Sequence, residues 1–342
     1  MDLLPSDDQS QLVEAASEFL AARFPIDGIR RNRDAASIID AQVWREAAEM
    51  GLLTLGLDER FGGSGQAIDD EALVFHALAR QLASGPFLSS TLGARLAAYA
   101  GDTDLAEAIG SGETMVGLAE LRGDGRVDAD GFKGAFDLLD CAGCTHALLV
   151  VRDGAALVEI AEFGDVRAVA AVDPGSRLST ATVADGRIHS WVPASVDWIW
   201  ARALVLNSAF LSGLAAAITE MSTEFAKTRV QFGRPIGANQ AIKHAIVDMA
   251  VRTESAWAQT LFAAAAVKAG RADAEFQILA AKTVAGTAAM NNGAASIQVH
   301  GGMGYTSEHN AHLYLKRAVV HRQLLSAPST VLADFLELKA AQ

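Results

Sequence analysis

The sequence predicts a mostly α-helical protein with a small β domain between two helical regions. Apolar residues at helical spacing dominate the first third of the chain, and short strand-like segments separated by Gly, Asp and Pro follow. Long apolar helical runs return after Pro193. A chain of 342 residues is longer than one hydrophobic core usually spans. We therefore predict a helical domain over residues 1–111, an antiparallel β domain over 112–194 and a four-helix bundle over 195–342.

The N-terminal region carries the signals of several helices. Ser6 and Gln9 form a capping box, and apolar residues then recur on one face as far as Leu20. Phe61–Gly65 is a glycine-rich loop. The other helices of this region are predicted over residues 38–50, 69–82, 88–98 and 104–109.

The middle region changes to short segments with period-two or continuous apolar character. The predicted strands include Met115–Leu118, Ala147–Val151, Ala156–Ile160 and Ala168–Val172. They leave no room for crossover helices, which favours an antiparallel sheet.

A Cys-x-x-Cys pair, Cys141 and Cys144, lies within this region. Zinc needs four ligands and only His146 is near, while a thioredoxin-type pair precedes a helix and this one precedes a predicted strand. We predict a turn between strands in a reducing compartment, and no metal site.

The C-terminal region predicts four helices. Residues 197–227 are apolar almost all round, as in a helix buried within a bundle, and Gly233, Pro235 and Gly237 interrupt this pattern. Asn239 is a candidate cap for a helix that runs to about residue 269. An alanine-rich helix over about 272–299 stops at two glycines, and a shorter helix covers about 310–323.

The composition excludes several classes of partner. A net charge of −13 argues against a nucleic-acid surface, and no apolar run approaches the length and purity of a membrane span. The N-terminus lacks the basic and apolar regions of a signal peptide, so a cytoplasmic location is expected. An acidic protein that binds an anion must gather its cations locally, and five lie around two glycine-rich motifs: Arg229, Arg234, Lys243, Lys316 and Arg317.

The two motifs, Arg229–Gly237 and Gln298–Tyr305, each follow a long helical run. Arginine offers forked donors to phosphate oxygens, and glycine lets backbone amides approach an anion. Together they predict a site for a phosphate-bearing cofactor. Taken singly, Gly301–Gly302 is also explained as a helix stop, and Gln298 as a buried amide.

These residues carry a resemblance to the acyl-CoA dehydrogenase family. The likeness rests on the α–β–α order, on Arg-Val-Gln-Phe-Gly-Arg-Pro-Ile-Gly-Ala-Asn-Gln (229–240) with Asp248-Met249, and on Gln-Val-His-Gly-Gly-Met-Gly-Tyr-Thr-Ser-Glu (298–308) followed by Lys316-Arg-Ala. Members bind FAD between two subunits. The resemblance implies that Arg229, Gln231 and Phe232 meet an FAD held mainly by a neighbouring protomer, with Gln298, Gly301 and Gly302 along its adenosine-diphosphate half and Gln240 close by.

The chain departs from the family where the catalytic base is expected. The family removes the α-proton of an acyl-CoA thioester with a glutamate while hydride leaves the β-carbon for the flavin. That glutamate occupies one of two positions, which here correspond to about Leu325 and to Ala203. Neither is a carboxylate, so no catalytic residue is assigned.

The flavin-binding runs of the β domain depart as well. The family's Thr-Glu-x-x-x-Gly-Ser-Asp run is replaced by Ala119-Glu-Leu-Arg-Gly-Asp-Gly125, and its Trp-Ile-Ser/Thr run by about Leu138-Leu-Asp140. The chain therefore resembles the base-lacking subunit of heteromeric acyl-CoA dehydrogenases of actinobacterial steroid side-chain degradation. In such a heterotetramer a homologous subunit supplies the base, and each FAD is shared.

Three hypotheses follow from the resemblance. The first is this non-catalytic subunit, with acyl-CoA as substrate of the complex, a bulky acyl group accommodated, and an electron-transfer flavoprotein as the usual acceptor. The second is a self-sufficient homomeric enzyme with a displaced base, Asp197 or Glu220, for which a helix N-terminal acid and a solvated surface charge are the simpler explanations. The third is a non-enzymatic scaffold or CoA-binding protein of the same fold.

Overall fold

The computed structural model describes residues 3–338, which form two compact units. The first, here called the bundle unit, contains residues 3–26, 72–83 and 204–338. The second, here the sheet unit, contains Asp27–Glu71 and Ser84–Ala203. These two units are defined by contacts in space and combine segments that are distant in sequence. They do not test the predicted sequence domains 1–111, 112–194 and 195–342, which stay a prediction.

The sheet unit is built around a seven-stranded sheet with the order β5-β6-β2-β1-β3-β4-β7. Its strands are β1 (Val116–Asp128), β2 (Gly131–Leu139), β3 (His146–Val151), β4 (Gly154–Glu159), β5 (Gly164–Val169), β6 (Leu178–Gly186) and β7 (Ser190–Pro193). The prediction of a purely antiparallel sheet is wrong at one pair, because β1 and β3 are parallel with Val116 opposite His146. No crossover helix is needed, since β2 returns along β1 before β3 begins.

Helix α5 (Phe87–Ala100) packs on β1, β3, β4 and β7. A Cβ on Gly93 would lie 3.0 Å from the Val116 side chain, so helix and sheet approach closely there. The hydroxyl of Ser89 donates to the Val116 carbonyl at 2.6 Å. The remaining helices of this unit are α2 (Asp27–Arg31), α3 (Ala41–Glu49), η1 (Glu59–Phe61), α6 (Thr103–Gly110) and η2 (Ile160–Glu162).

Cys141 and Cys144 lie in the turn between β2 and β3, as predicted. Both thiols are free, and burial raises the pKa of Cys144 to about 12 and that of Cys141 well above its ordinary value. Among the described residues no group of His, Cys, Asp and Glu side chains is placed to hold a metal ion. These thiols are therefore structural rather than reactive.

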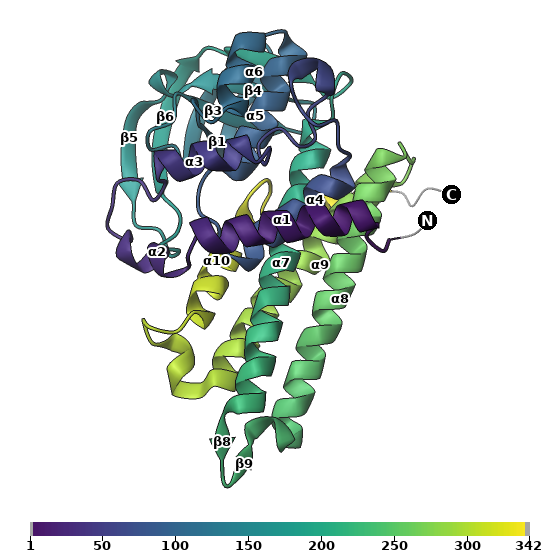
Figure 1. The fold of residues 1–342 in the computed structure, drawn as a ribbon. Coiled ribbons are helices and arrows are strands. Elements are labelled where there is room, and N and C mark those ends of the chain that lie inside the picture. Colours follow the sequence, from purple (N-terminus) through teal and green to yellow (C-terminus); the bar gives the residue numbers. More distant parts are fainter. Residues whose placement is uncertain (1–2, 339–342) are drawn as a thin grey trace. The chain divides into compact units, whose positions relative to one another are not determined.

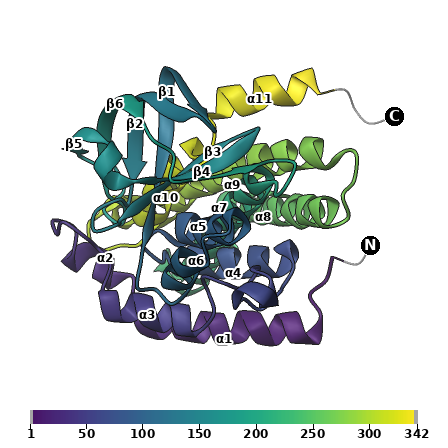
Figure 2. The ribbon, with the colours of Figure 1, turned by 90° about the horizontal axis from the view of Figure 1, so that it is seen from above.

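The bundle unit contains the predicted four-helix bundle. Its helices are α7 (Ile199–Thr228, which enters this unit at Leu204), α8 (Gln240–Lys268), α9 (Ala274–His300) and α10 (Ala311–Gln323). Figure 1 shows α7 and α8 side by side with the β8–β9 hairpin (Val230–Gln231 and Arg234–Pro235) at their shared end. The unit also contains α1 (Asp7–Arg23), most of α4 (Ile68–Arg80), η3 (Ile236–Ala238), η4 (Gly301–Tyr305) and α11 (Pro328–Glu337). Figure 2 shows α11, a helix that the sequence did not predict, and this helix contacts α9.

Small polar side chains join α7, α8 and α9 inside the bundle. The amide of Asn292 donates to the Met249 carbonyl at 2.9 Å and to Thr253 Oγ1 at 3.0 Å. Thr253 also contacts Thr219, and Ser222 donates to Ser296 at 2.9 Å. Because each of these buried groups has a partner, the helices are fixed in rotation and register as well as held together.

Two details of the predicted helices need correction. Helix α7 is long and apolar enough to meet a membrane-span criterion, contrary to the sequence prediction, yet 89% of its apolar window is buried inside the protein, as in a core helix. Asn239 precedes α8 but makes no side-chain cap bond, because its Oδ1 accepts a hydrogen bond from Arg234 at 2.8 Å. The predicted capping box of Ser6 and Gln9 is confirmed.

Candidate functional site

The two glycine-rich motifs lie at the same end of the bundle. The chain runs along α7 to the β8–β9 hairpin, back along α8, and along α9 to η4, so the last turns of α7 and α9 lie together. The ring of Phe225 on α7 lies 4.4 Å from the ring of His300 on α9. Segments about 70 residues apart in sequence are therefore neighbours in this unit, as a common cofactor site requires.

The first motif forms an exposed hairpin. Arg229 and Gln231 are exposed, and the Gln231 amide donates to its neighbour's carbonyl, that of Val230, at 2.8 Å. The Phe232 side chain is 99% exposed and has a φ of 51°, a left-handed conformation that non-glycine residues seldom adopt. A large apolar ring held outward at a strained position is typical of a contact residue for another molecule.

The second motif ends α9 with a turn open to solvent. Gln298 lies exposed in the last turn, and its carbonyl accepts the amide of Gly301. Gly301 has φ 59° and ψ −141°, a conformation that only glycine adopts readily. A Cβ added at Gly302 would meet nothing within 4 Å, so the fold of this chain does not itself require glycine there. Gly304, in contrast, is buried, and a Cβ there would lie 2.8 Å from the Ile297 carbonyl oxygen.

His300 is a feature of this end that sequence reasoning did not single out. The ring is 4% exposed and lies between Phe225 and the ring of His309, at 4.4 and 4.3 Å. Its Nδ1 donates to the Ser296 carbonyl at 2.7 Å, which makes Nε2 an acceptor, and Nε2 has no hydrogen-bond partner in the described chain. Burial lowers the pKa of His300, while the Ser296 carbonyl acts in the opposite direction. The one indication in the sequence that His300 belongs to this site is its position inside the Gln-Val-His-Gly-Gly motif.

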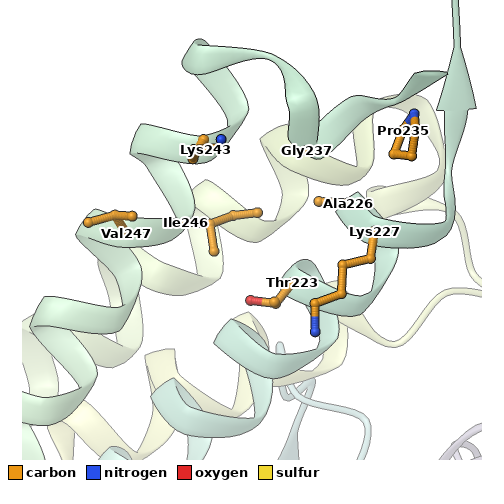
Figure 3. Close-up of a pocket in the computed structure, with 8 residues that line it drawn as sticks. All are labelled: Thr223, Ala226, Lys227, Pro235, Gly237, Lys243, Ile246 and Val247. Carbon is orange, nitrogen blue, oxygen red and sulfur yellow. The ribbon is translucent and has the colours of Figure 1, made fainter.

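A groove of about 370 Å³ lies between the ends of α7 and α8, beside the hairpin. Figure 3 shows Ile246 on α8 pointing toward the Thr223 and Lys227 side of α7, and Val247 also lines the groove. Lys227 is paired with Glu224 at 2.7 Å, and Lys243 is exposed at the α8 side. The groove is thus mainly apolar with lysines at its edge.

The predicted cluster of five cations is not a single surface. Arg317 is buried, 2% exposed, and donates to the Ala83 carbonyl at 3.1 Å, so it is a structural residue. Arg234 is bonded to Asn239. Arg229 and Lys243 remain as exposed cations close to the hairpin, while Gln240 is exposed at the first position of α8.

The residues at this end fit the diphosphate part of a dinucleotide. An exposed arginine supplies charged donors, and the open space over Gly301 and Gly302 lets a large anion approach the backbone. These residues would contact only the diphosphate side of such a cofactor. Of the cavities described here, the groove between α7 and α8 lies beside the first motif.

The two positions aligned with the family's base hold apolar residues in well-defined places. Ala203 is fully buried in α7. Leu325 lies in the turn between α10 and α11, where Leu325 and Ser326 have φ values of 63° and 143°.

The two displaced candidates are both ion-paired. Asp197 accepts from Arg95 at 2.6 and 3.0 Å, and its side chain is 14% exposed. Glu220 accepts from Arg80 at 2.6 Å and is exposed. The Asp197 oxygens are occupied by the Arg95 guanidinium, and the exposed Glu220 lacks a dry pocket, so neither is arranged as a general base.

The sheet segments aligned with the family's flavin-binding runs serve the sheet itself. Leu138 is 1% exposed and belongs to the apolar core with Ala119 and Phe136. The carboxylate of Asp140 accepts from the Arg177 amide at 2.7 Å, and the Asp140 amide donates to the Arg177 carbonyl at 2.8 Å. These side chains are engaged in local structure at positions where an aromatic wall and hydroxyl donors are expected.

Comparison with known proteins identifies the family. The acyl-CoA dehydrogenase N-terminal domain matches residues 6–109, and the acyl-CoA dehydrogenase C-terminal domain matches residues 176–324. The chain is 31% identical over 335 residues to acyl-CoA dehydrogenase IpdE2 of Mycobacterium tuberculosis, covering 96% of both chains.

Solved structures share the fold over the whole chain. The ChsE4–ChsE5 complex from Mycobacterium tuberculosis contains a chain with a TM-score of 0.86 at 22% identity, covering 99% of this chain and 100% of that one. The Tcur3481–Tcur3483 steroid acyl-CoA dehydrogenase G363A variant gives 0.84 at 22% identity, covering 97% of both. With two matching domains, a relative similar along nearly its whole length and the same fold, this chain belongs to the acyl-CoA dehydrogenase family of oxidoreductases.

Proposed function

We propose that this chain is the non-catalytic subunit of a heteromeric FAD-dependent acyl-CoA dehydrogenase, and that it completes a flavin site held mainly by a catalytic partner. The observation that carries the proposal is an asymmetry. The exposed bundle end keeps Arg229, Gln298 and the open Gly301–Gly302 turn, while Ala203 and Leu325 occupy the two base positions.

Each retained residue has a role that its position allows. Arg229 donates to the pyrophosphate, and the backbone at Gly301 and Gly302 approaches it without side-chain obstruction. Phe232 contributes an apolar surface beside the flavin, with Gln231 near it, and Gln298 and Gln240 offer amides to the adenosine half. The bound FAD supplies hydride acceptance during α,β-desaturation of an acyl-CoA thioester.

The relatives' names favour a heteromer and a steroid-type substrate. One similar structure is a complex of two chains, ChsE4 and ChsE5, and another is titled a steroid acyl-CoA dehydrogenase made from Tcur3481 and Tcur3483. By analogy, the partner is a homologous chain that carries the glutamate base, and the substrate class is an acyl-CoA with a bulky ring system. An electron-transfer flavoprotein is the proposed electron acceptor.

Two alternatives make different predictions. A homomeric enzyme with a displaced base would use Asp197 or Glu220, and the Arg95 and Arg80 ion pairs argue against it. A non-enzymatic scaffold would have no use for an exposed Arg229 beside an open glycine turn.

Co-expression distinguishes the three functions. The chain is purified alone and together with a candidate catalytic homologue, and the visible spectrum and acyl-CoA oxidation are recorded for each. Flavin at one FAD per pair, found only on co-expression, is the expected result. Flavin and turnover in the chain alone would support the homomeric enzyme, in which case Asp197→Asn or Glu220→Gln must abolish turnover. Absence of flavin from every preparation would support the scaffold.

Within the complex, Arg229→Ala tests the shared site. Loss of one charge-assisted contact of about 1.5–3 kcal/mol predicts flavin binding weaker by about tenfold or more. Lys268→Ala, which removes an exposed cation at the opposite end of α8, serves as the control and should retain flavin. Equal flavin content in the two variants would contradict the assignment of Arg229.

A further inference from the structure

A second cavity lies in the bundle unit, bounded by α9, the end of α10 and the start of α11. It measures about 300 Å³ and is separate in sequence from the hairpin and the α9 terminus described above. Its lining combines two basic side chains and hydroxyls with an apolar wall from α11. None of its lining residues is among those assigned to the proposed flavin site.

Two cations from different helices reach the cavity. Lys282 of α9 is 3% exposed, and its Nζ donates to the His321 carbonyl at 2.9 Å. Arg322 of α10 lies against α9 at Gly286, where a Cβ would be 3.2 Å from its Cγ. Among the ion pairs of residues 3–338, none includes Arg322. Its charge is therefore not neutralised by a carboxylate of the described chain, which favours an anionic ligand.

The start of α11 adds to the positive character of the cavity. This helix of ten residues begins at Pro328, and Ala327 before it provides no side-chain cap. Pro328 and Ser329 line the cavity, so the positive end of the helix dipole faces it. The environment is already cationic at the adjacent His321, whose pKa is lowered well below its ordinary value by burial and then by Arg317 and Lys282.

The opposite wall is apolar. Val331 is 1% exposed and Leu332 is 48% exposed, and both line the cavity on α11. Thr283 and Thr287 add methyl and hydroxyl groups from α9. A fully hydrated inorganic anion would leave this wall without a partner, whereas a carboxylate with an aliphatic body would cover both kinds of surface.

We propose that this cavity binds a small aliphatic carboxylate. Its head group lies at Arg322, near Lys282 and the first turn of α11, and its hydrocarbon part lies along Val331 and Leu332. The bound ligand would contact α9, α10 and α11.

Isothermal titration of the full chain with hexanoate tests the proposal, with hexanol and inorganic phosphate as comparison probes. Hexanoate should bind, hexanol should bind at least about tenfold more weakly, and phosphate should bind weakly because it gains no apolar contact. Equal binding of hexanol would overturn the anion site, and equal binding of phosphate would overturn the aliphatic part. Absence of hexanoate binding would overturn both.

Variants separate a built site from general charge attraction. Arg322→Gln should weaken hexanoate binding about tenfold, whereas Lys316→Gln on the same helix, outside the cavity, should leave it unchanged. Leu332→Asn should weaken hexanoate without changing phosphate, and this half-exposed position does not risk the fold. If both glutamine variants bind equally well, the proposal is wrong. Flavin content does not enter these measurements, so the outcome is independent of the proposed shared site.

Discussion

The ring of Phe225, near the end of α7, lies 4.4 Å from the ring of His300, at the end of α9. This contact joins the helix that carries the Arg229 motif to the helix that carries the Gly301–Gly302 turn. Neither residue is on the surface proposed to meet the cofactor, yet the pair sets the distance between the two halves of that surface.

Phe225→Ala should therefore affect both stability and cofactor binding. Removing the ring leaves a gap between α7 and α9, and large-to-small substitutions of this kind cost about 1–4 kcal/mol. Urea denaturation of the variant measures the loss, and flavin retention of the co-expressed complex measures the change at the site. Phe225→Leu, which fills most of the gap, should recover most of both. A variant that loses stability but holds flavin normally would show that this contact does not position the motifs.

Two neighbouring glycines should respond oppositely to alanine. Gly302→Ala should leave stability unchanged, since a Cβ there meets nothing within 4 Å, and should lower flavin occupancy of the complex. Gly304→Ala should destabilise the chain by about 1–3 kcal/mol because its Cβ would lie 2.8 Å from a backbone oxygen. Thermal unfolding and flavin absorbance of the two variants test this contrast. Normal flavin content with Gly302→Ala would mean that the glycine is only part of a surface turn.

The long elements were predictable because their signals are local. Ser6 with Gln9 gave the start of α1, and continuous apolar character gave α7 and the bundle. The parallel pairing of β1 with β3 was not predicted. It arises because β2 pairs with one edge of β1 and β3 pairs with the other edge, and the residues of these strands do not indicate which edge a later strand joins.

The exposure of the predicted site residues agrees with the motifs, whereas their surroundings were harder to predict. Arg229, Gln298 and Gly302 were proposed from their motifs and the resemblance, and the structure places all three at the surface, while their role in a flavin site stays a prediction. Sequence proximity placed Arg317 in the same cluster, but its bond to the Ala83 carbonyl depends on a segment more than 200 residues away. The buried Nε2 of His300 has no hydrogen-bond partner in the described chain, and this likewise depends on packing, here against Phe225 of α7 and against His309, which precedes α10.

One buried and one exposed ion pair allow the effect of burial on stability to be measured, the first in the sheet unit and the second in the bundle unit. Glu71 is 2% exposed and pairs with Arg202 inside the sheet unit, where burial lowers the pKa of Arg202 to about 10. Glu71→Gln should cost about 3–5 kcal/mol because it leaves a buried guanidinium without its counter-charge. Glu220→Gln breaks the exposed pair with Arg80 and should cost less than about 1 kcal/mol. Chemical denaturation of both variants measures the difference, and similar losses would contradict the role of burial.

Buried histidines make stability depend on pH. Burial lowers the pKa of His76 to about 3, with Arg80 as a second cause, and it also lowers the pKa of His300 and, to well below its ordinary value, that of His321. In the unfolded chain these rings titrate near pH 6.5. Below that pH the unfolded state binds protons that the folded state excludes, so the free energy of unfolding falls as the pH falls.

Between about pH 6.5 and 4.5 the pH dependence of stability comes mainly from these histidines and not from carboxylates. The carboxylates with lowered pKa values lose their contribution at lower pH, as with Asp273, whose pKa is lowered to about 2 mainly by its bond to Arg271. Each histidine kept neutral contributes a slope of at most about 1.4 kcal/mol per pH unit. His76→Gln should reduce the measured slope by up to that amount. Urea denaturation at several pH values gives both slopes, and identical slopes for the His76 variant and the natural chain would show that this ring is protonated in the folded state.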